Sequence, residues 1–480
     1  MQELADTHFW EKGARVGNGI CPRREAACPV APGTSPRGQA VDQTEDTLEF
    51  SCGAQSMLQS VCGFLLAVLA GGLLVLAAYV CGLTALALLR PPTPPRAAGQ
   101  QRRFAILVPA HNEEALIGRL LVNLQQLDYP STKFDTYVVA DNCSDDTASL
   151  ARSHRARVYE RFDRTLEGKG FALRWLLERI REGRDRYDAF VVLDADSVVA
   201  ANFLQSMDSR LEAGSQVIQA YYSVLNTGES PVATLRFVAL AALHYLRPLG
   251  RSALGLSCGL KGNGMCFAAP VLERFGWEWF ALAEDVEFHL ALVEEGIRVD
   301  FAPETYVLAD MPTTLQQADS QNARWERGRL QLLRRRVPRL LVTGLRQRSA
   351  LRLDAAVEQS IPPLSVPIAL GSLCLGASLA LGLAVPAALA ALGLVGQALY
   401  LLIGLRAVHA PPRVYRALAY APLYMLWKVG LYLRVLGNTR STRWIRTART
   451  PAVLDAVSVL PTANRASAEP ASADGQRRSA

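Results

Sequence analysis

The sequence lacks the cysteine patterns that bind zinc or cross-link a small fold. Its nine cysteines include no C-x-x-C pair, and no His/Cys spacing fits a zinc site. Three of them, Cys62, Cys81 and Cys374, lie in strongly apolar runs. A small disulfide scaffold is therefore excluded, and the scattered cysteines are compatible with a reducing compartment.

Charged residues are also scarce. They make up 20% of the 480 residues, whereas 50% are hydrophobic, and an average soluble domain contains about 25% charged residues. This balance excludes disorder for most of the chain and favours a membrane segment. The net charge of +7 is a modest bias towards anionic lipids or substrates. Nucleic acid is not an expected partner, because positive charge and aromatics mix only near residues 324–336.

One long stretch without charge runs from Phe50 to Leu89. A bilayer crossing needs about 20 apolar residues, so we predict one transmembrane helix at residues 57–90. A signal peptide fits poorly, because more than fifty residues would precede its apolar part. Closely following arginines place the next domain in the cytoplasm under the positive-inside rule. They are Arg90, Arg96, Arg102 and Arg103.

A second uncharged stretch covers residues 359–405. One helix of that length would span about 70 Å, more than twice the hydrocarbon core, so we predict a transmembrane hairpin. Val385-Pro386 near the centre is the expected hinge. Residues 413–437 are apolar but contain cations and aromatics, which predicts an interfacial or transmembrane helix.

The remaining flanking segments carry weaker signals. Residues 336–358 are predicted to form an interfacial linker. Residues 1–56 are polar and rich in turn formers, which predicts a disordered or non-native extension. Residues 438–480 form a basic tail that is predicted to be largely disordered.

Residues 102–335 have the rhythm of an α/β domain. Apolar strands are predicted at 104–108, 136–139 and 189–193, and helices at 113–127, 145–154 and 168–181. Continuous apolar strands that alternate with helices indicate a mostly parallel sheet covered on both faces. Ligands of such sheets bind at the carboxyl ends of strands. Polar clusters stand at three of these ends, in residues 111–113, 141–146 and 194–196.

Asp194 and Asp196 form a D-x-D motif at the end of a predicted strand. Mg²⁺ or Mn²⁺ bound to a nucleotide diphosphate uses one or two carboxylates together with phosphate oxygens. An isolated D-x-D is common, however, and is also found in solvated turns. Residues 194–198 also fit the D-x-D-x-[TV] start of a haloacid-dehalogenase-type phosphatase, in which Asp194 would be the phosphorylated nucleophile.

Two further segments combine charge with helical spacing. Glu284 and Asp285 open a predicted helix, where acids also suit the helix dipole; a catalytic Asp285 would take a proton from an acceptor hydroxyl. Gln321, Arg324 and Trp325 share one helix face. Arginine suits a pyrophosphate and tryptophan a sugar face, although such a tryptophan can also be core or membrane-anchoring.

Taken in order, these segments resemble the membrane-embedded family-two glycosyltransferases of the cellulose, hyaluronan and poly-N-acetylglucosamine synthase type. The likeness covers residues 102–335 and the flanking apolar helices, and it depends on the joint order of several motifs. They are VPAHNEE (108–114), ADNCSDDT (140–147), EGKGFAL (167–173), LDADS (193–197), GNGMCF (262–267), AEDVEFHL (283–290) and QNARW (321–325). The resemblance implies a GT-A type domain that uses Mg²⁺ or Mn²⁺.

The resemblance also implies roles for individual residues. Asp285 would be the catalytic base, and Asp194 and Asp196 would hold the metal. Donor contacts would come from Pro109, Ala110, Glu113, Asp141, Lys169, Asp194 and Arg324. Acceptor contacts would come from Gly264, Met265, Cys266, Gln321 and Trp325.

The leading hypothesis is an inverting UDP-sugar-dependent glycosyltransferase that builds a β-linked polysaccharide at the cytoplasmic face of a bacterial inner membrane. Its expected partners are a UDP-sugar, a glycan or lipid acceptor and membrane lipid. Three or four membrane segments are few for a polymer channel, so a membrane partner or a homo-oligomer is also expected. The alternatives are single sugar transfer to a lipid, a membrane-tethered metal-dependent phosphatase, and a non-catalytic scaffold. The phosphatase gives Trp325 no role.

Overall fold

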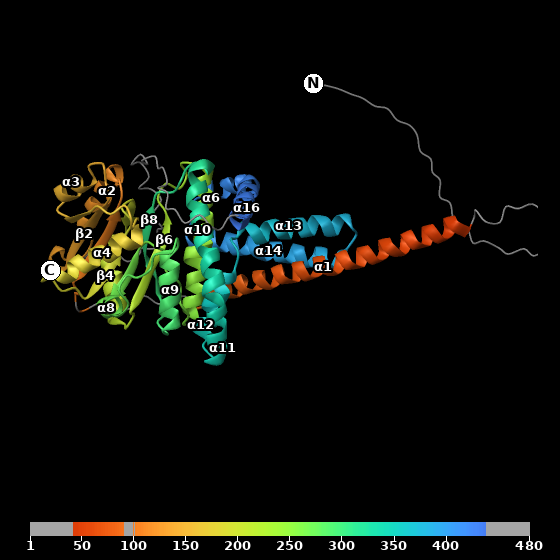
Figure 1. Ribbon diagram of the computed structural model, residues 1–480, viewed down its shortest axis with the longest axis horizontal. Helices are drawn as coiled ribbons and strands as arrows, with labels where there is room; N and C mark the ends of the chain where they lie inside the picture. The colour runs from red at the N-terminus through yellow and green to blue at the C-terminus, as the bar shows by residue number, and fades with distance from the viewer. Residues whose placement is uncertain (1–41, 91–98, 100, 438–480) are drawn as a thin grey trace, which may run out of the picture. The chain divides into compact units, whose positions relative to one another are not determined.

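The computed structural model describes residues 42–90, 99 and 101–437 (Figure 1). The chain divides into two units, Met1–Ser60 and Val61–Ala480. Helix α1 (Asp42–Leu89) begins in the first unit, so residues 42–56 are helical and the predicted extension is shorter than residues 1–56. The predictions for residues 1–41 and 438–480 lie outside the described residues.

The centre of the second unit is an eight-stranded sheet with the order β3-β2-β1-β4-β7-β6-β8-β5. Strands β3, β2, β1 and β4 are parallel, β7 runs antiparallel to both neighbours, β8 is parallel to β6, and β5 is antiparallel to β8. The strands are β1 (Phe104–Ala110), β2 (Phe134–Asp141), β3 (Arg157–Arg161), β4 (Ala189–Val192), β5 (Ser197–Val199), β6 (Val217–Val224), β7 (Met265–Ala268) and β8 (Asp300–Ala309).

Helices cover this sheet on both sides (Figure 1). Helix α4 packs on β1 and β2, α5 and α7 pack on β8, and α6 packs on β6. Around the sheet the helices are α2 (Glu114–Gln125), η1 (Ser131–Lys133), α3 (Thr147–Ser153), α4 (Lys169–Glu182), α5 (Phe203–Glu212), α6 (Pro231–Leu240), η2 (Ala241–Leu246), α7 (Arg247–Ala253), α8 (Ala269–Phe275) and α9 (Glu284–Glu294). After β8 follow α10 (Leu315–Arg335), α11 (Val337–Arg346), α12 (Ala350–Ser360), α13 (Ser365–Ala380), α14 (Ala384–Ala407), α15 (Pro412–Ala417), η3 (Leu418–Tyr420) and α16 (Ala421–Gly437).

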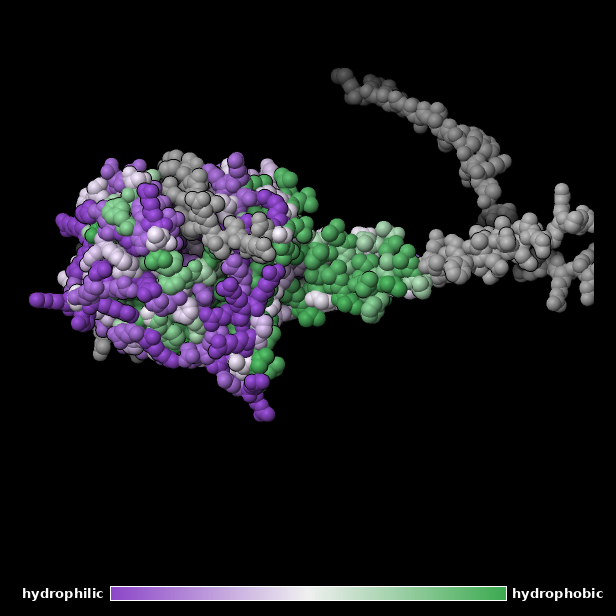
Figure 2. Space-filling view, in the orientation of Figure 1, coloured by the Kyte–Doolittle hydropathy of each residue, from purple (hydrophilic) through white to green (hydrophobic). Residues whose placement is uncertain are grey.

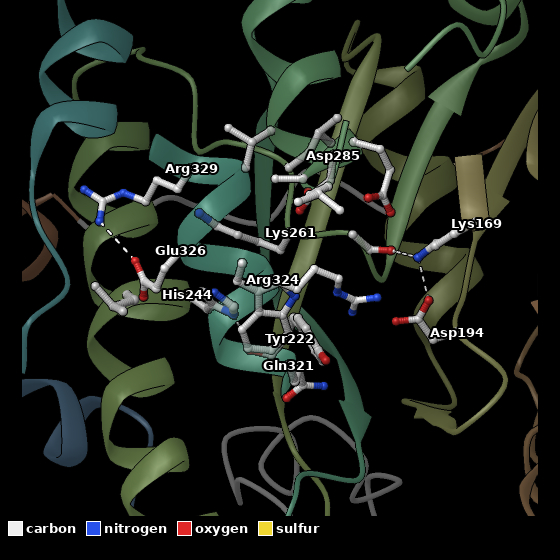
Figure 3. A pocket seen from close by; sticks show the side chains of 18 of the residues that line it. Lys169, Asp194, Tyr222, His244, Lys261, Asp285, Gln321, Arg324, Glu326 and Arg329 are labelled. Carbon is white, nitrogen blue, oxygen red and sulfur yellow. Dashed lines mark hydrogen bonds and ion pairs between the residues drawn. The ribbon is translucent and has the colours of Figure 1, made fainter. Parts of the chain in front are cut away.

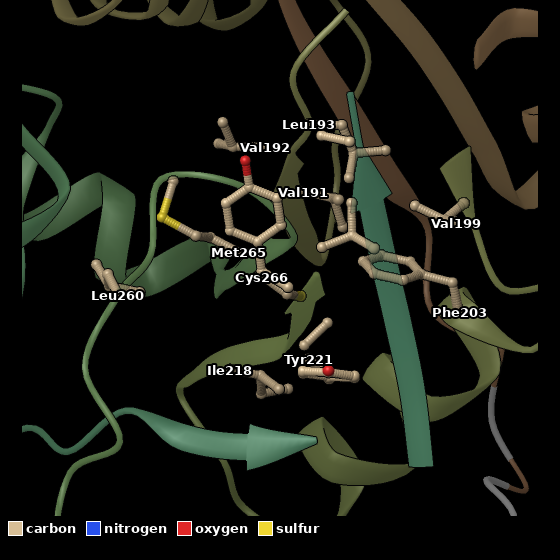
Figure 4. Packing of buried hydrophobic residues seen from close by; sticks show 14 of the residues in the cluster. Val191, Val192, Leu193, Val199, Phe203, Ile218, Tyr221, Leu260, Met265 and Cys266 are labelled. Atoms are coloured by element: carbon tan, nitrogen blue, oxygen red, sulfur yellow. The ribbon is translucent and has the colours of Figure 1, made fainter. Parts of the chain in front are cut away.

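The sheet forms the hydrophobic core because its central strands are apolar on both faces. Every residue of β6 is buried, and six of the seven residues of β1 are buried. Figure 4 shows β4 and β7 side chains packed with Phe203 and Tyr221 in this core. The α/β architecture is confirmed, and the three predicted strands and three predicted helices occur with their ends shifted by a few residues.

Within the part of the chain that the structure describes, three helical segments are long and apolar enough to cross a membrane: Met57–Leu89, Pro231–Ala253 and Ala384–Ala407. The bent pair α12 and α13 would make a fourth. Figure 2 shows hydrophobic surface over α13, α14 and the adjoining part of α1, next to the more hydrophilic surface of the sheet domain. The predicted span at 57–90 is therefore a long apolar helix, and the predicted hairpin at 359–405 contains α13 and α14.

The hairpin turns earlier than predicted. The break lies at Leu381–Leu383, where Gly382 has φ +68°, and not at Val385-Pro386. Pro386 instead occupies the first turn of α14, where backbone N–H groups have no intrahelical acceptor and proline costs nothing. Gly382 supplies the left-handed conformation that ends α13.

The segment Pro231–Ala253 is one continuous helix, formed by α6, a π-helical turn (η2) and α7. Although its composition would allow a membrane crossing, 67% of its most apolar stretch is buried inside the protein, and it packs on β6. We therefore regard it as a core helix. The sequence reasoning did not identify it.

The segments after β8 form more helix than predicted. Residues 336–358, which were predicted to form an interfacial linker, hold α11 and most of α12. Residues 413–437 contain α15, η3 and α16. Helix α16 packs against α10 and α13, which places it between the sheet domain and the apolar hairpin.

Candidate active site

A cavity of about 1000 Å³ lies at the carboxyl ends of β1, β2 and β4. Because these strands are parallel neighbours, their ends bring Ala110, Asp141 and Asp194 to one edge of the sheet. From there the cavity extends between α6, α10, α13 and α16. Its volume is at the upper end of the range for ligand sites, so it can hold more than one substrate.

The end of the cavity at the edge of the sheet contains most of the predicted donor contacts and is called the donor end. Pro109, Ala110, Glu113 and Asp141 line it together. Arg161 forms an ion pair with Asp141 at 2.5 Å, which fixes that carboxylate. Burial nevertheless raises the pKa of Asp141.

The D-x-D carboxylates lie beside this end. Asp194 and Asp196 both line the cavity. The backbone around them is held on both sides: Asn263 Oδ1 accepts from the Asp194 amide at 3.1 Å, and the Asp196 carbonyl accepts from Arg119 at 2.7 Å. No cluster of three or more His, Cys, Asp or Glu side chains that could hold a metal occurs among the described residues. Two carboxylates fit a hard cation whose other ligands are phosphate oxygens and water.

Lys169 closes the donor end. Its ammonium lies 2.5 Å from Asp194 Oδ1 and also donates to the Gly262 carbonyl (Figure 3). Burial opposes the charged form, but Asp194 and Glu284 outweigh burial and raise the pKa of Lys169. Gly170 is required next to it, because a Cβ there would lie 2.3 Å from the Trp279 carbonyl oxygen. Because its pKa is raised, the Lys169 ammonium stays charged beside the expected diphosphate.

Asp285 and Glu284 face the cavity from the first turn of α9. Burial raises the pKa of Asp285, and burial together with the Asp285 charge raises the pKa of Glu284 to about 7. Gly262 lies beside this turn in a left-handed conformation, with φ +79°, which glycine adopts without strain. The two carboxyls share the space between the donor end and α10.

Helix α10 brings Gln321, Arg324 and Trp325 to the same cavity. Its close approach to α9 depends on Gly328, where a Cβ would meet Ala283 at 2.9 Å. Arg324 points towards Lys169 and Asp194 in Figure 3. The structure therefore groups the predicted base, metal and donor residues with the helix that was predicted to contact the acceptor.

Three predicted acceptor residues are not part of this group. Met265 and Cys266 lie in β7 with exposed fractions of 1% and 0%, inside the core of Figure 4. Gly264 is packed against Val307, and none of the three lines the cavity. They lie in the core because β7 continues directly from the glycine turn into the sheet, and their contact with the acceptor stays a prediction. Only the start of that loop, at Lys261 and Gly262, reaches the cavity.

The sequence reasoning missed a group of polar residues beyond Trp325. They line the cavity from α6, η2, α7, the loop before β7, α12 and α16: Arg236, His244, Arg247, Lys261, Glu358 and Lys428. Among them, His244 Nδ1 lies 3.2 Å from the Tyr222 carbonyl oxygen, and its ring faces the cavity. The available signal was a lone arginine and a lone histidine in the apolar stretch 231–246.

His289, by contrast, is a core residue. It is buried, its Nε2 bonds Ser257 Oγ at 2.9 Å, and burial lowers its pKa to about 3.

Residues 101–328 match the model of the family described as glycosyltransferase like family 2. This part of the chain is therefore similar to the family 2 glycosyltransferases. The match begins just before β1 and ends within α10, three residues after Trp325. It thus contains the residues predicted for the base, the metal and the donor. The phosphatase alternative is set aside, because the D-x-D belongs to this domain.

Two curated relatives match the same domain. The beta-monoglucosyldiacylglycerol synthase of Trichormus variabilis is 30% identical over 235 residues, which cover 47% of this chain and 48% of that protein. The probable glycosyltransferase YdaM of Bacillus subtilis is 24% identical over 232 residues, which cover 47% of this chain and 55% of that protein. The chain thus spans about half the length of the curated relatives it matches.

A solved structure supports the fold. The mannosyltransferase PcManGT from Pyrobaculum calidifontis, in complex with GDP-Man and Mn²⁺, matches with a TM-score of 0.50 and 18% identity. The match covers 72% of this chain and 97% of that chain. The predicted GT-A fold is therefore confirmed.

Proposed function

We propose that this protein transfers a sugar from a nucleotide-sugar donor to a hydroxyl of a membrane lipid. One observation carries the proposal: a single cavity joins the strand-end carboxylates to an apolar space beside α13 and α14, which are apolar enough to span a membrane. A soluble acceptor gains nothing from such a space, whereas an acyl chain buries apolar surface there.

The far end of the cavity is lined almost wholly by apolar side chains. Those of α6 and η2 face residues of α13, α14 and α16 and of the loop before α13. The lining residues are Leu235, Val238, Ala239, Leu243, Ile361, Pro362, Pro363, Leu364, Ile368, Leu401, Leu418, Ala421 and Met425. This surface suits a lipid tail. The name of the Trichormus variabilis relative also points to a lipid product, whereas polysaccharide synthesis stays a prediction that no feature of the cavity favours.

In the proposed reaction, Asp141 and Glu113 lie against the nucleoside, and Lys169 and Arg324 neutralise the diphosphate. Mg²⁺ or Mn²⁺ held by Asp194 and Asp196 would add positive charge to the leaving group when bound. The proposal takes the donor to be a UDP-sugar, as the resemblance implies.

Asp285 is the proposed general base. Its carboxylate takes the proton of the acceptor hydroxyl, whose oxygen bonds to the anomeric carbon as the bond to the diphosphate oxygen breaks. Attack from the face opposite the leaving group inverts the configuration. Placement of this chemistry at the cytoplasmic face of a bacterial membrane stays a prediction.

The test uses the purified full chain in detergent with mixed bacterial phospholipids, diacylglycerol and a panel of radiolabelled UDP-sugars. We expect metal-dependent transfer of one sugar into the chloroform-soluble fraction. Label that enters only water-soluble polymer would contradict the lipid acceptor. The Asp285→Asn protein controls for adventitious transfer.

A further inference from the structure

The middle of the cavity, between the donor end and the apolar end, is strongly cationic. Six cations line it together with the carboxylates Glu326 and Glu358. The cations are Arg236, Arg247, Lys261, Arg324, Arg329 and Lys428. Glu284 and Asp285 face this region from the start of α9, so the six cations outnumber the four carboxylates by two, next to an apolar surface.

Three of the six cations already have a carboxylate. Arg247 pairs with Glu358 at 3.1 Å, and Lys428 pairs with Glu326 at 3.1 Å. Arg329 also lies 3.7 Å from Glu326. Among the described residues, no ion pair joins the other three, Arg236, Lys261 and Arg324, to a carboxylate.

Of these three, Arg324 points to the donor end and has its role there (Figure 3). The side chain of Lys261 points away from Lys169 and Asp194, towards the side of the cavity that holds His244 and Arg329. Arg236 stands on the otherwise apolar helix α6, with its guanidinium 4.5 Å from the centroid of the Trp325 ring. Its Nε is buried without a hydrogen-bond partner.

Partly desolvated cations without counter-charges raise the free energy of an empty site, and a bound anion recovers that energy. Burial lowers the pKa of Lys261, and the nearby charge of Glu358 offsets that effect only in part. An anion at this place would lie beyond Trp325 from the donor, beside the apolar residues Leu235 and Val238. That is where the headgroup of a lipid in the apolar end would lie.

We infer that the acceptor is an anionic glycerophospholipid, whose phosphate is bound by Arg236 and Lys261 while its free hydroxyl reaches Asp285. The inference rests on the proposed lipid acceptor and adds its headgroup class. It differs from a neutral diacylglycerol acceptor, which brings no negative charge to either cation. The step balances without another reactant: the hydroxyl proton goes to Asp285, and the nucleoside diphosphate leaves with the bonding electrons.

The test compares two acceptors at equal mole fraction in dodecyl maltoside micelles, dioleoyl phosphatidylglycerol and dioleoylglycerol, with the full chain and its active donor. We expect kcat/KM to be at least tenfold higher for phosphatidylglycerol. Arg236→Gln and Lys261→Gln should each raise the KM for phosphatidylglycerol about tenfold and change the KM for the donor less than twofold. Arg236→Lys should recover part of the loss.

Arg416→Gln is the matched control, because it removes an exposed cation from α15 outside the cavity. A similar loss in this variant would mean that general attraction to anionic micelles explains the preference. A preference for dioleoylglycerol would overturn the inference. So would a loss in Arg236→Gln that falls on the donor KM, since the anion would then belong to the donor sugar.

A binding measurement separates this inference from the proposed function. Native mass spectrometry of the full chain should show retention of phosphatidylglycerol over dioleoylglycerol, reduced in Arg236→Gln and normal in Asp285→Asn. Selective retention without lipid transfer would refute the proposed function and leave the anion site standing. Lipid transfer without selective retention would refute the anion site alone.

Discussion

The two ends of the cavity differ in chemistry and in how the chain builds them. The donor end is acidic and comes from the ends of β1, β2 and β4, where strand order alone brings the residues together. The acceptor end is cationic and then apolar, and it comes from helices distant in sequence, from α6 to α16. A common fold can thus hold the donor, while the surrounding helices determine what receives the sugar.

The largest expected difference between sugar transfer and donor binding is caused by substitution of Asp285. Asp285→Asn should lower transfer by about 10³-fold, in the range that general-base catalysis contributes, because the amide takes no proton. UDP affinity, measured by calorimetry, should change less than threefold. Glu287→Gln on the same helix turn, outside the cavity lining, is the control. Lost UDP binding in Asp285→Asn would refute its role as the base.

The donor end depends on metal if the D-x-D has the proposed role. Asp196→Asn should lower transfer by about 10²-fold, because the variant would bind less tightly the metal that neutralises the leaving diphosphate. UDP binding by the wild type should weaken on addition of EDTA, and binding by the variant should respond little to EDTA or Mn²⁺. Equal metal dependence in both proteins would show that Asp196 is not a ligand.

Helix α16 ties the two ends together through two ion pairs to α10, and the pairs differ in burial. Lys428 is buried and contacts Glu326 at 3.1 Å and Asn322 at 2.6 Å. Arg434 is 64% exposed and pairs with Asp319 at 2.7 Å.

Lys428→Met should therefore destabilise the protein by about 2 kcal/mol, because it leaves buried acceptors poorly paired. Arg434→Met should cost at most about 1 kcal/mol. Thermal unfolding in detergent compares the two variants. Equal shifts in Tm would mean that Lys428 does not hold α10.

Transfer to a lipid should depend on the free volume of the apolar end. Ala421 lines it from α16, so Ala421→Trp should lower transfer to long-chain lipid about tenfold by filling the space. Hydrolysis of the donor should change less than twofold. Ala417→Trp, just outside the lining, should leave both rates near the wild-type values. A parallel fall in donor hydrolysis and lipid transfer would argue against separate ends.

A last expected effect is on the pH dependence of stability. Burial raises the pKa of Glu284 to about 7 from its ordinary 4.5, so between these values the folded state holds a proton that the unfolded state has lost. This carboxyl therefore destabilises the fold as pH rises from about 4.5 to 7. Glu284→Gln removes the effect, and its Tm relative to wild type should increase from pH 5 to pH 8. An unchanged Tm difference would refute the raised pKa.

The donor end could be predicted from the sequence, because a polar residue that directly follows a buried parallel strand has only one edge to occupy. Asp141 and Asp194 were placed correctly for this reason. Met265 and Cys266 could not be placed in the core from the sequence, because a glycine turn does not tell which of its neighbours enter the sheet. The sequence could not predict that Arg236 and Lys261 line the same cavity, since only tertiary packing brings α6 to the loop before β7.

The most direct test of the shared cavity is a structure of the Asp285→Asn protein in nanodiscs that contain phosphatidylglycerol, with UDP-sugar and Mn²⁺. We predict nucleotide density at Asp141 and Asp196 and, in the same structure, density for an acyl chain between α6, α13 and α16. Nucleotide density with a glycan or only water in the apolar end would contradict the account.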